Sequence, residues 1–106
     1  KNRNLFLKKI YSIKTKGLPL VAVGAAAKGN TFLNYYNLDH TVIDYVTDVS
    51  KYKIGKYTAL TRIPIVSDDI FSKYDEVYAL VLTGNISGNL KKILHQINPR
   101  IKFISP

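Results

Sequence analysis

The stretch that decides the fold, residues 18–35, reads L-P-L-V-A-V-G-A-A-A-K-G-N-T-F-L-N-Y. Its apolar run at 20–23 predicts a short buried strand of a parallel sheet. Gly24 ends that strand, and Asn30 or Thr31 can cap the helix that follows. The first N–H groups of a helix have no intrahelical partner, and the helix dipole favours negative charge there. The stretch therefore predicts a strand, a glycine turn and a helix N-terminus at which a phosphate-bearing ligand can bind.

This turn matches neither standard nucleotide fingerprint. The dinucleotide motif G-x-G-x-x-G fails because Ala22 stands at its first glycine. The P-loop motif fits the glycine spacing of residues 24–31, but Asn30 stands where the phosphate-binding lysine belongs, which disfavours a kinase or NTPase. Two interpretations stay open: the small residues serve only the packing of helix on strand, or they let a ligand approach the backbone.

Length and composition indicate one soluble globular domain. The chain has 106 residues, of which 46% are hydrophobic and 22% charged. It has no apolar run near the ~20 residues that span a bilayer and no signal-peptide pattern, so we expect a cytoplasmic protein. It has no cysteine, which excludes disulfides and thiolate metal sites. Methionine is also absent, even at position 1, so we expect a domain cut from a longer chain.

The charge balance favours acidic partners. The formal net charge is +9, which suits nucleotides, sugar phosphates, nucleic acid or an anionic membrane surface. Residues 1–16 contain six lysines and arginines and no acid. We interpret this segment as an amphipathic helix with a solvated basic face in preference to a binding surface.

The remaining pattern alternates between helix and strand. The sequence predicts helices at 2–15, 30–37, 67–74 and 89–97, strands at 20–23, 41–47, 62–66, 76–83 and 101–104, and a loop at 49–61. This order is that of a three-layer, Rossmann-like α/β domain with a mostly parallel sheet of about five strands. Right-handed crossovers should bring the turns after Val23, Val46 and Leu82 to one edge of the sheet.

Polar residues follow several of these strands. Asp48 ends the strand at 41–47; a carboxylate here can accept hydrogen bonds from ribose hydroxyls or cap the next turn. Asn85 follows the strand at 76–83, at the edge where ligands gather in such folds. In the loop, lysines alternate with Tyr52 and Tyr57, a mixture that can hold phosphates and stack a base or simply stay exposed.

The sequence predicts binding residues but no catalytic group and no metal site. His40 and His95 are far apart, and no acidic pair brackets either one. The serines lack the context of a nucleophile elbow. The acidic pairs at 68–69 and 75–76 are interpreted as helix caps and solvated charge.

Four segments carry a family resemblance: G-A-A-A-K-G-N-T-F-L-N-Y at 24–35, D-Y-V-T-D at 44–48, K-I-G-K-Y at 53–57 and I-P-I at 63–65. Together they resemble the C-terminal domain of bacterial sugar C-methyltransferases, over residues 2–106. The resemblance implies a Rossmann-like domain, not catalytic alone, that holds a nucleotide diphosphate-sugar. It also implies an upstream domain that binds S-adenosylmethionine and carries the catalytic groups.

The resemblance also implies site residues. Around the diphosphate it places Gly24, Ala25, Lys28, Gly29 and Asn30, with Thr31 beside them at the start of the helix. Near the rest of the substrate it places Asn34, Asp48, Lys56, Tyr57 and Asn85. We add Arg62 to the candidate substrate-binding residues, at a position where the family usually has histidine. The chain departs from the family pattern at Ala22 (usually glycine), at Arg62 (usually histidine) and at Thr83-Gly84 (usually Pro-Trp), so its ligand can differ from the family's.

Two alternatives of other classes stay open. A small nucleic-acid-binding module would use the N-terminal lysines and the loop at 51–57, but no recognised nucleic-acid motif is present. A scaffold domain would only pack against a partner domain. The substrate-binding interpretation ranks first, because no motif supports nucleic-acid binding and the eight tyrosines of an α/β fold are needed in its core.

Overall fold

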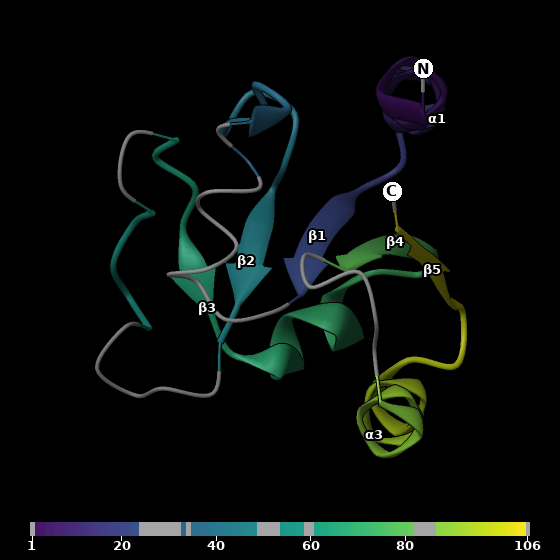
Figure 1. Ribbon diagram of the computed structural model, residues 1–106. Coiled ribbons are helices and arrows are strands. Elements are labelled where there is room, and N and C mark those ends of the chain that lie inside the picture. The colour runs from purple at the N-terminus through teal and green to yellow at the C-terminus, as the bar shows by residue number, and fades with distance from the viewer. Residues whose placement is uncertain are drawn as a thin grey trace.

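The computed structural model describes residues 2–23, 33, 35–48, 54–58, 61–81 and 87–105. Helices and strands alternate along the chain (Figure 1). In order, they are α1 (Asn2–Thr15), β1 (Leu20–Val23), β2 (Tyr45–Thr47), β3 (Ile65–Val66), the 3₁₀-helix η1 (Asp68–Lys73), β4 (Val77–Val81), α3 (Gly88–Ile97) and β5 (Ile101–Ile104). Positions 33 and 35 are also helical; the rest of the helix predicted at 30–37 is a turn at 36–37 or lies outside the described residues.

The strands form one sheet in the order β3-β2-β1-β4-β5, and every neighbouring pair is parallel. The chain runs from β1 outward through β2 to β3, and then crosses to the other side of β1 for β4 and β5. This is a doubly wound order. It confirms the predicted Rossmann-like α/β domain with a parallel sheet.

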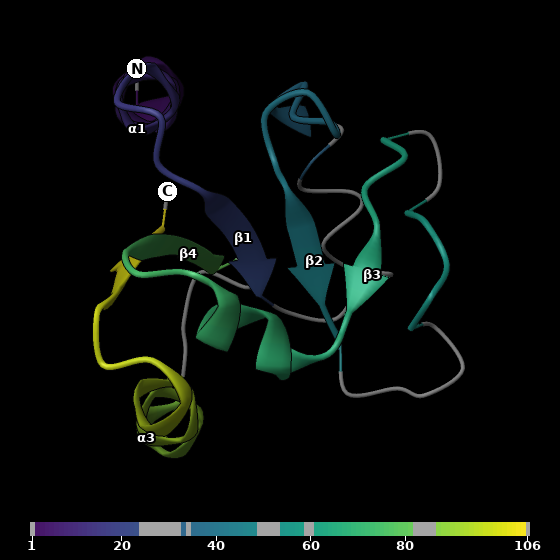
Figure 2. The same cartoon turned by 180° about the vertical axis from the view of Figure 1, so that it is seen from behind.

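Helices cover both faces of the sheet (Figures 1 and 2). Along β1, Leu20 and Ala22 belong to the hydrophobic cluster under α1, whereas Val21 and Val23 belong to the cluster under η1 and α3. All four residues are buried. A strand buried on both faces has a continuous apolar run instead of an alternating one, which is why the run at 20–23 marks the centre of the sheet.

Gly17 ends the first helix. The Leu18 N–H donates to the Ile13 carbonyl at 3.3 Å, and the Gly17 N–H donates to the Lys14 carbonyl at 2.9 Å. This is the Schellman arrangement, in which the residue after the helix adopts a left-handed conformation. Gly17 does so, with φ at +76°, and turns the chain toward β1.

The strand predicted at 41–47 is shorter than its sequence indicates. The Asp39 carboxylate accepts hydrogen bonds from the backbone N–H and the hydroxyl of Thr41, and these bonds lower the pKa of Asp39. The Asp39 carbonyl accepts from the N–H groups of Val42 and Ile43. A local turn thus takes the donors that a strand would use, and β2 begins only at Tyr45.

The described part of the loop predicted at 49–61 forms the outer arm of a hairpin. The Gly55 N–H donates to the Ile65 carbonyl at 2.9 Å, and the Ile65 N–H donates to the Lys56 carbonyl at 2.8 Å. Residues 54–58 therefore run beside β3 and cover the edge of the sheet (Figure 1). β3 itself spans only Ile65–Val66 of the strand predicted at 62–66. It is an edge strand of the main sheet, as Pro64 predicts.

Two helix starts differ from each other. Ser67 precedes η1 as predicted, but its side chain makes no capping hydrogen bond. Ser87 caps α3 instead, because its Oγ accepts from the Leu90 N–H at 3.1 Å. None of the helices that the structure describes is long and apolar enough to cross a membrane.

Candidate functional site

The carboxyl ends of the central strands line up at one edge of the sheet. Val23 at the end of β1 pairs with Thr47 of β2 on one side and with Val81 of β4 on the other. Thr47 in turn pairs with Val66 of β3. Figures 1 and 2 show the arrowheads of β1, β2 and β3 at the same edge. The chain continues from these ends into residues 24, 48, 67 and 82, so the predicted glycine turn and Asp48 start from adjacent strands.

This edge contains the point at which the winding of the fold reverses. β1 is followed by strands on one side of it, and β4 lies against its other side. In open α/β sheets, ligands bind outside the carboxyl ends of the strands at such a point. The register of Val23 with Val81 places it between β1 and β4.

Most of the predicted site residues lie outside the described part of the chain. These are Gly24, Ala25, Lys28, Gly29, Asn30, Thr31, Asn34 and Asn85. Their roles stay predictions. What the structure supplies is the position of Val23 and Val81, the described residues from which two of these segments continue.

Asp48 is the predicted residue that the structure places at this edge. It follows β2 directly, is half-buried, and donates its backbone N–H to the Val66 carbonyl at 3.1 Å. Beside it, Thr47 is almost fully buried, with 2% of its surface exposed. A half-buried carboxylate at a strand end can accept hydrogen bonds from ligand hydroxyls; this role for Asp48 stays a prediction.

Lys56, Tyr57 and Arg62 lie further out. Lys56 and Tyr57 belong to the arm beside β3, and 65% of the Tyr57 surface is exposed. Arg62 is exposed, has φ at +59°, and lies in the turn that leads into β3. That turn is at the amino end of the strand, so the structure does not bring Arg62 together with Asp48.

Asp44, at the other end of β2, has a structural role that sequence reasoning missed. Its Oδ2 accepts from the Leu20 N–H at 2.8 Å and from the Lys14 Nζ at 3.0 Å. One carboxylate therefore joins α1, the first residue of β1 and the start of β2. The partners are 24 and 30 residues away in sequence, so no local signal predicts them.

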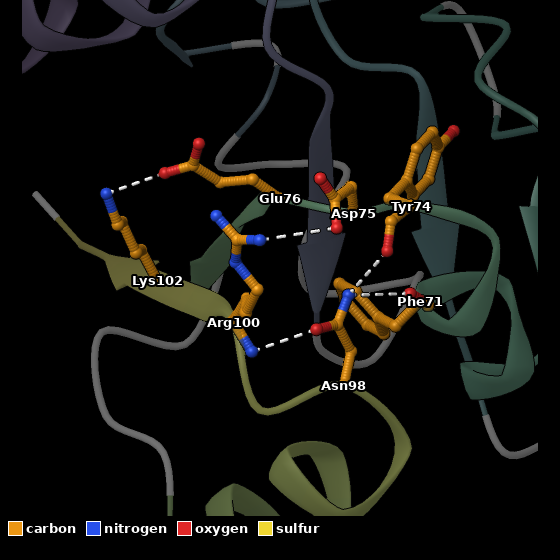
Figure 3. Close-up of polar contacts among 7 residues, drawn as sticks. All are labelled: Phe71, Tyr74, Asp75, Glu76, Asn98, Arg100 and Lys102. Atoms are coloured by element: carbon orange, nitrogen blue, oxygen red, sulfur yellow. Dashed lines mark hydrogen bonds and ion pairs between the residues drawn. The ribbon is translucent and has the colours of Figure 1, made fainter.

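Asn98 is a second such residue (Figure 3). Its Nδ2 donates to the carbonyls of Phe71 and Tyr74, both at 2.9 Å, and its Oδ1 accepts from the Arg100 N–H at 2.8 Å. The side chain is buried, with 6% exposed. It holds the C-terminal end of η1 against the turn between α3 and β5. Its place just before Pro99 is a turn signal, but the sequence does not show the long-range partners.

Charged side chains surround the same turn (Figure 3). Lys102 Nζ lies 2.7 Å from Glu76 Oε2. The hydrogen bond and the charge of Lys102 lower the pKa of Glu76, and Glu76 raises the pKa of Lys102. Arg100 and Asp75 form a longer and more exposed pair at 3.3 Å. Burial, followed by the charge of Asp44, raises the pKa of the nearby Tyr74 phenol.

Both histidines contact backbone carbonyls. His40 Nδ1 lies 3.3 Å from the Thr61 carbonyl, and His95 Nε2 lies 3.1 Å from the Ile101 carbonyl. The His95 ring also packs on Phe103. In the described residues, no three histidines or acids come together as a metal site requires.

One family model matches the chain over residues 1–106, and its description is C-methyltransferase C-terminal domain. The chain belongs to this family. The match covers all four segments that carry the resemblance. A search of curated proteins finds no match. In this C-methyltransferase C-terminal domain, the described part of the candidate site consists of the Rossmann-like strand order and the aligned carboxyl ends of β1, β2, β3 and β4.

Proposed function

We propose that this chain is the substrate-holding domain of an S-adenosylmethionine-dependent sugar C-methyltransferase and binds a nucleotide diphosphate-sugar at the carboxyl edge of the sheet. The observation that supports this most is the strand order β3-β2-β1-β4-β5, with Val23 paired to both Thr47 and Val81. This register makes the glycine turn and Asp48 continue from adjacent strand ends at the reversal point. Family membership supplies the reaction class.

In this proposal, binding is electrostatic and positional. The backbone N–H groups of the glycine turn and the ammonium group of Lys28 hold the diphosphate. The residues assigned to this part are Gly24, Ala25, Lys28, Gly29, Asn30 and Thr31. Asp48 accepts hydrogen bonds from ribose or sugar hydroxyls, and Asn34 and Asn85 supply further polar groups to the substrate.

The outer residues take a smaller part. Lys56 and Tyr57 contact a ligand only where it extends past β3, because the arm that carries them lies on the outer side of that strand. Arg62 is the assigned residue with the least structural support, since its turn is at the opposite edge of the sheet.

The methyl donor and the catalytic groups belong, in this proposal, to an upstream domain of a longer cytoplasmic protein. S-adenosylmethionine supplies the methyl group there, and no residue of this chain is assigned to it. The work of this chain is to orient the sugar carbon toward that domain, since correct positioning of two reactants alone lowers a reaction barrier substantially.

Calorimetric titration with a thymidine diphosphate-sugar tests the proposal. Lys28→Ala should weaken binding by ~1.5–3 kcal/mol, the range for a hydrogen bond to a charged group. The matched control is Lys8→Ala, which removes the same charge from an exposed position on α1 and should leave the affinity unchanged. If Lys28→Ala binds the nucleotide-sugar as tightly as the wild type does, the diphosphate does not bind at this turn.

A further inference from the structure

A cavity of about 410 Å³ lies on the opposite flank of α1 from Asp44, between that helix and strands β4 and β5. Figure 1 shows the C-terminal end of β5 on the side of the sheet that faces α1. The cavity is lined by Lys9, Ser12, Ile13, Lys16, Tyr78, Phe103, Ile104 and Ser105. It lies over a face of the sheet, so it is distinct from the carboxyl edge between β1 and β4.

The helical repeat explains why lysines face this cavity. The buried stripe of α1, with Ile10 at its centre, points down onto the sheet. One flank carries Lys14, which reaches Asp44 at the start of β2. Lys9, Ser12 and Lys16 are spaced three and four residues apart and therefore share the other flank. That flank faces β4 and β5, where Ile104 packs in the same hydrophobic cluster as Ile10 and Ile13 of α1.

Lys9 and Lys16 differ from the neighbouring lysines in their ion pairs. Among the described residues, Lys14 and Lys102 have carboxylate partners, whereas no ion pair involves Lys9 or Lys16, and both are exposed. Glu76, the residue before β4, already pairs with Lys102 at 2.7 Å. Its pKa is lowered chiefly by Lys102 and also by Lys16, so the positive field of Lys16 reaches this region. The cavity therefore keeps a net positive charge.

The lining fits a particular ligand class. The positions of Lys9 and Lys16 are about 10 Å apart along the helix axis at ~1.5 Å per residue. Ammonium groups are common phosphate ligands. The hydroxyl groups of Ser12, Tyr78 and Ser105 add hydrogen-bond donors. The volume lies in the range of roughly 300–1,000 Å³ that small-molecule sites occupy.

We propose that this cavity is a second anion site, which binds a small phosphate-bearing molecule between α1 and the β4–β5 strands. The phosphate groups lie between the Lys9 and Lys16 ammonium groups, and the hydroxyls of the lining complete their hydrogen bonds. The site is independent of the proposed nucleotide-sugar site, because it shares no residue with it.

The test is a titration of the isotope-labelled 106-residue chain with inorganic pyrophosphate, followed by backbone amide shifts. We expect saturable shifts at Ser12, Lys16 and Ser105. Lys9→Ala combined with Lys16→Ala should weaken binding at these residues by about tenfold, because charge-assisted hydrogen bonds are the strong ones. Lys9→Ala places alanine at an exposed position of α1, which favours the helix, and Lys16 is exposed just beyond the end of α1.

The matched control combines Lys8→Ala with Lys92→Ala, which removes the same charge from exposed positions outside the cavity. It should bind pyrophosphate as the wild type does. Equal weakening in the two double variants would show a response to net charge alone and would overturn the proposal, as would the absence of shifts at the three residues. Nucleotide-sugar binding should survive in the Lys9/Lys16 variant, so failure here is distinguishable from failure of the proposed function.

Discussion

At the amino edge of the sheet, polar side chains hold elements of the fold together, whereas at the carboxyl edge the predicted ligand-binding residue Asp48 follows β2, next to the end of β1. Asp44 and Asp48 show the difference within one strand. Asp44 precedes β2 and bonds to the Leu20 N–H and to Lys14. Asp48 follows β2 and lies beside the ends of β1 and β3. An aspartate thus has a structural role at one end of β2 and a predicted ligand-binding role at the other end.

The winding of the fold accounts for this contrast. In a parallel α/β sheet, helices begin near the carboxyl ends of the strands, so their N–H groups and the ligand site gather there. At the amino edge of such a sheet, neither helix N-termini nor a ligand site gathers. Here its turns are closed by Asp44 and by Asn98, which joins η1 to the turn before β5. Substitutions at the amino edge should therefore change stability, and those at the carboxyl edge should change binding.

The largest effect is expected at Asn98. Asn98→Ala should lower the free energy of unfolding by about 2–3 kcal/mol, because the carbonyls of Phe71 and Tyr74 lose a buried donor. Denaturant unfolding measures this. Asn89→Ala is the control, because Asn89 is exposed on the first turn of α3, and it should change stability by less than ~0.5 kcal/mol. Similar stability of the two variants would contradict the structural role of Asn98.

The next effect is at Asp44. Asp44→Ala should lower the free energy of unfolding by about 1–2 kcal/mol, less than a buried charge because 38% of its side chain is exposed. The comparison variant is Asp75→Ala, whose carboxylate pairs with Arg100 but is 91% exposed, and which should cost under ~0.5 kcal/mol. If Asp75→Ala is the more destabilising of the two, the contacts of Asp44 do not stabilise the fold as proposed.

A substitution of Asp48 tests the predicted ligand binding at the carboxyl edge. Asp48→Ala should weaken binding of a thymidine diphosphate-sugar by roughly tenfold, the ratio that about 1.4 kcal/mol represents. Asp44→Ala removes the same charge from the other end of β2 and should leave the dissociation constant unchanged where the variant is folded. Calorimetry on both variants decides this. Loss of binding in Asp44→Ala alone would reverse the assignment of the two edges.

The smallest effect is a pH dependence at Tyr74. Burial and the charge of Asp44 raise the pKa of this phenol, whereas in the unfolded chain it ionises near ~10. The unfolded state therefore loses its proton first, and stability falls as the pH rises above that value. In Tyr74→Phe this fall should be shallower, as measured by thermal unfolding between about pH 9 and 11. Identical slopes would show that Tyr74 is not in the half-buried position described.

Patterns that depend on neighbouring residues predicted the fold well. The helix at 2–15 and the strands at 20–23 and 101–104 are confirmed residue by residue, because their apolar spacing and the glycine at 17 act locally. The start of β2 was wrong because Asp39 takes the donors of residues 41–43 into a turn, against their β-branched character.

Interactions between distant segments were not predictable from one sequence. The partners of Asp44 and the carbonyl partners of Asn98 are two dozen or more residues away. The arm at 54–58 pairs with β3 although its lysines and glycine indicate a loop. For the site, the edge and the place of Asp48 followed from strand order. The anion-binding interpretation of the glycine turn came from its residues, and the nucleotide diphosphate-sugar came from the resemblance; the residues of this turn lie outside the described part of the chain.

Binding of a nucleotide diphosphate-sugar at the carboxyl edge is tested most directly by an amide-shift titration of the labelled chain with a thymidine diphosphate-sugar. We predict saturable shifts from Val23 through Thr31 and at Asp48, with little change at Asp44 and Asn98. Shifts that gather around Asp44 and Asn98, or a spectrum that responds only to oligonucleotide in a salt-sensitive way, would contradict it.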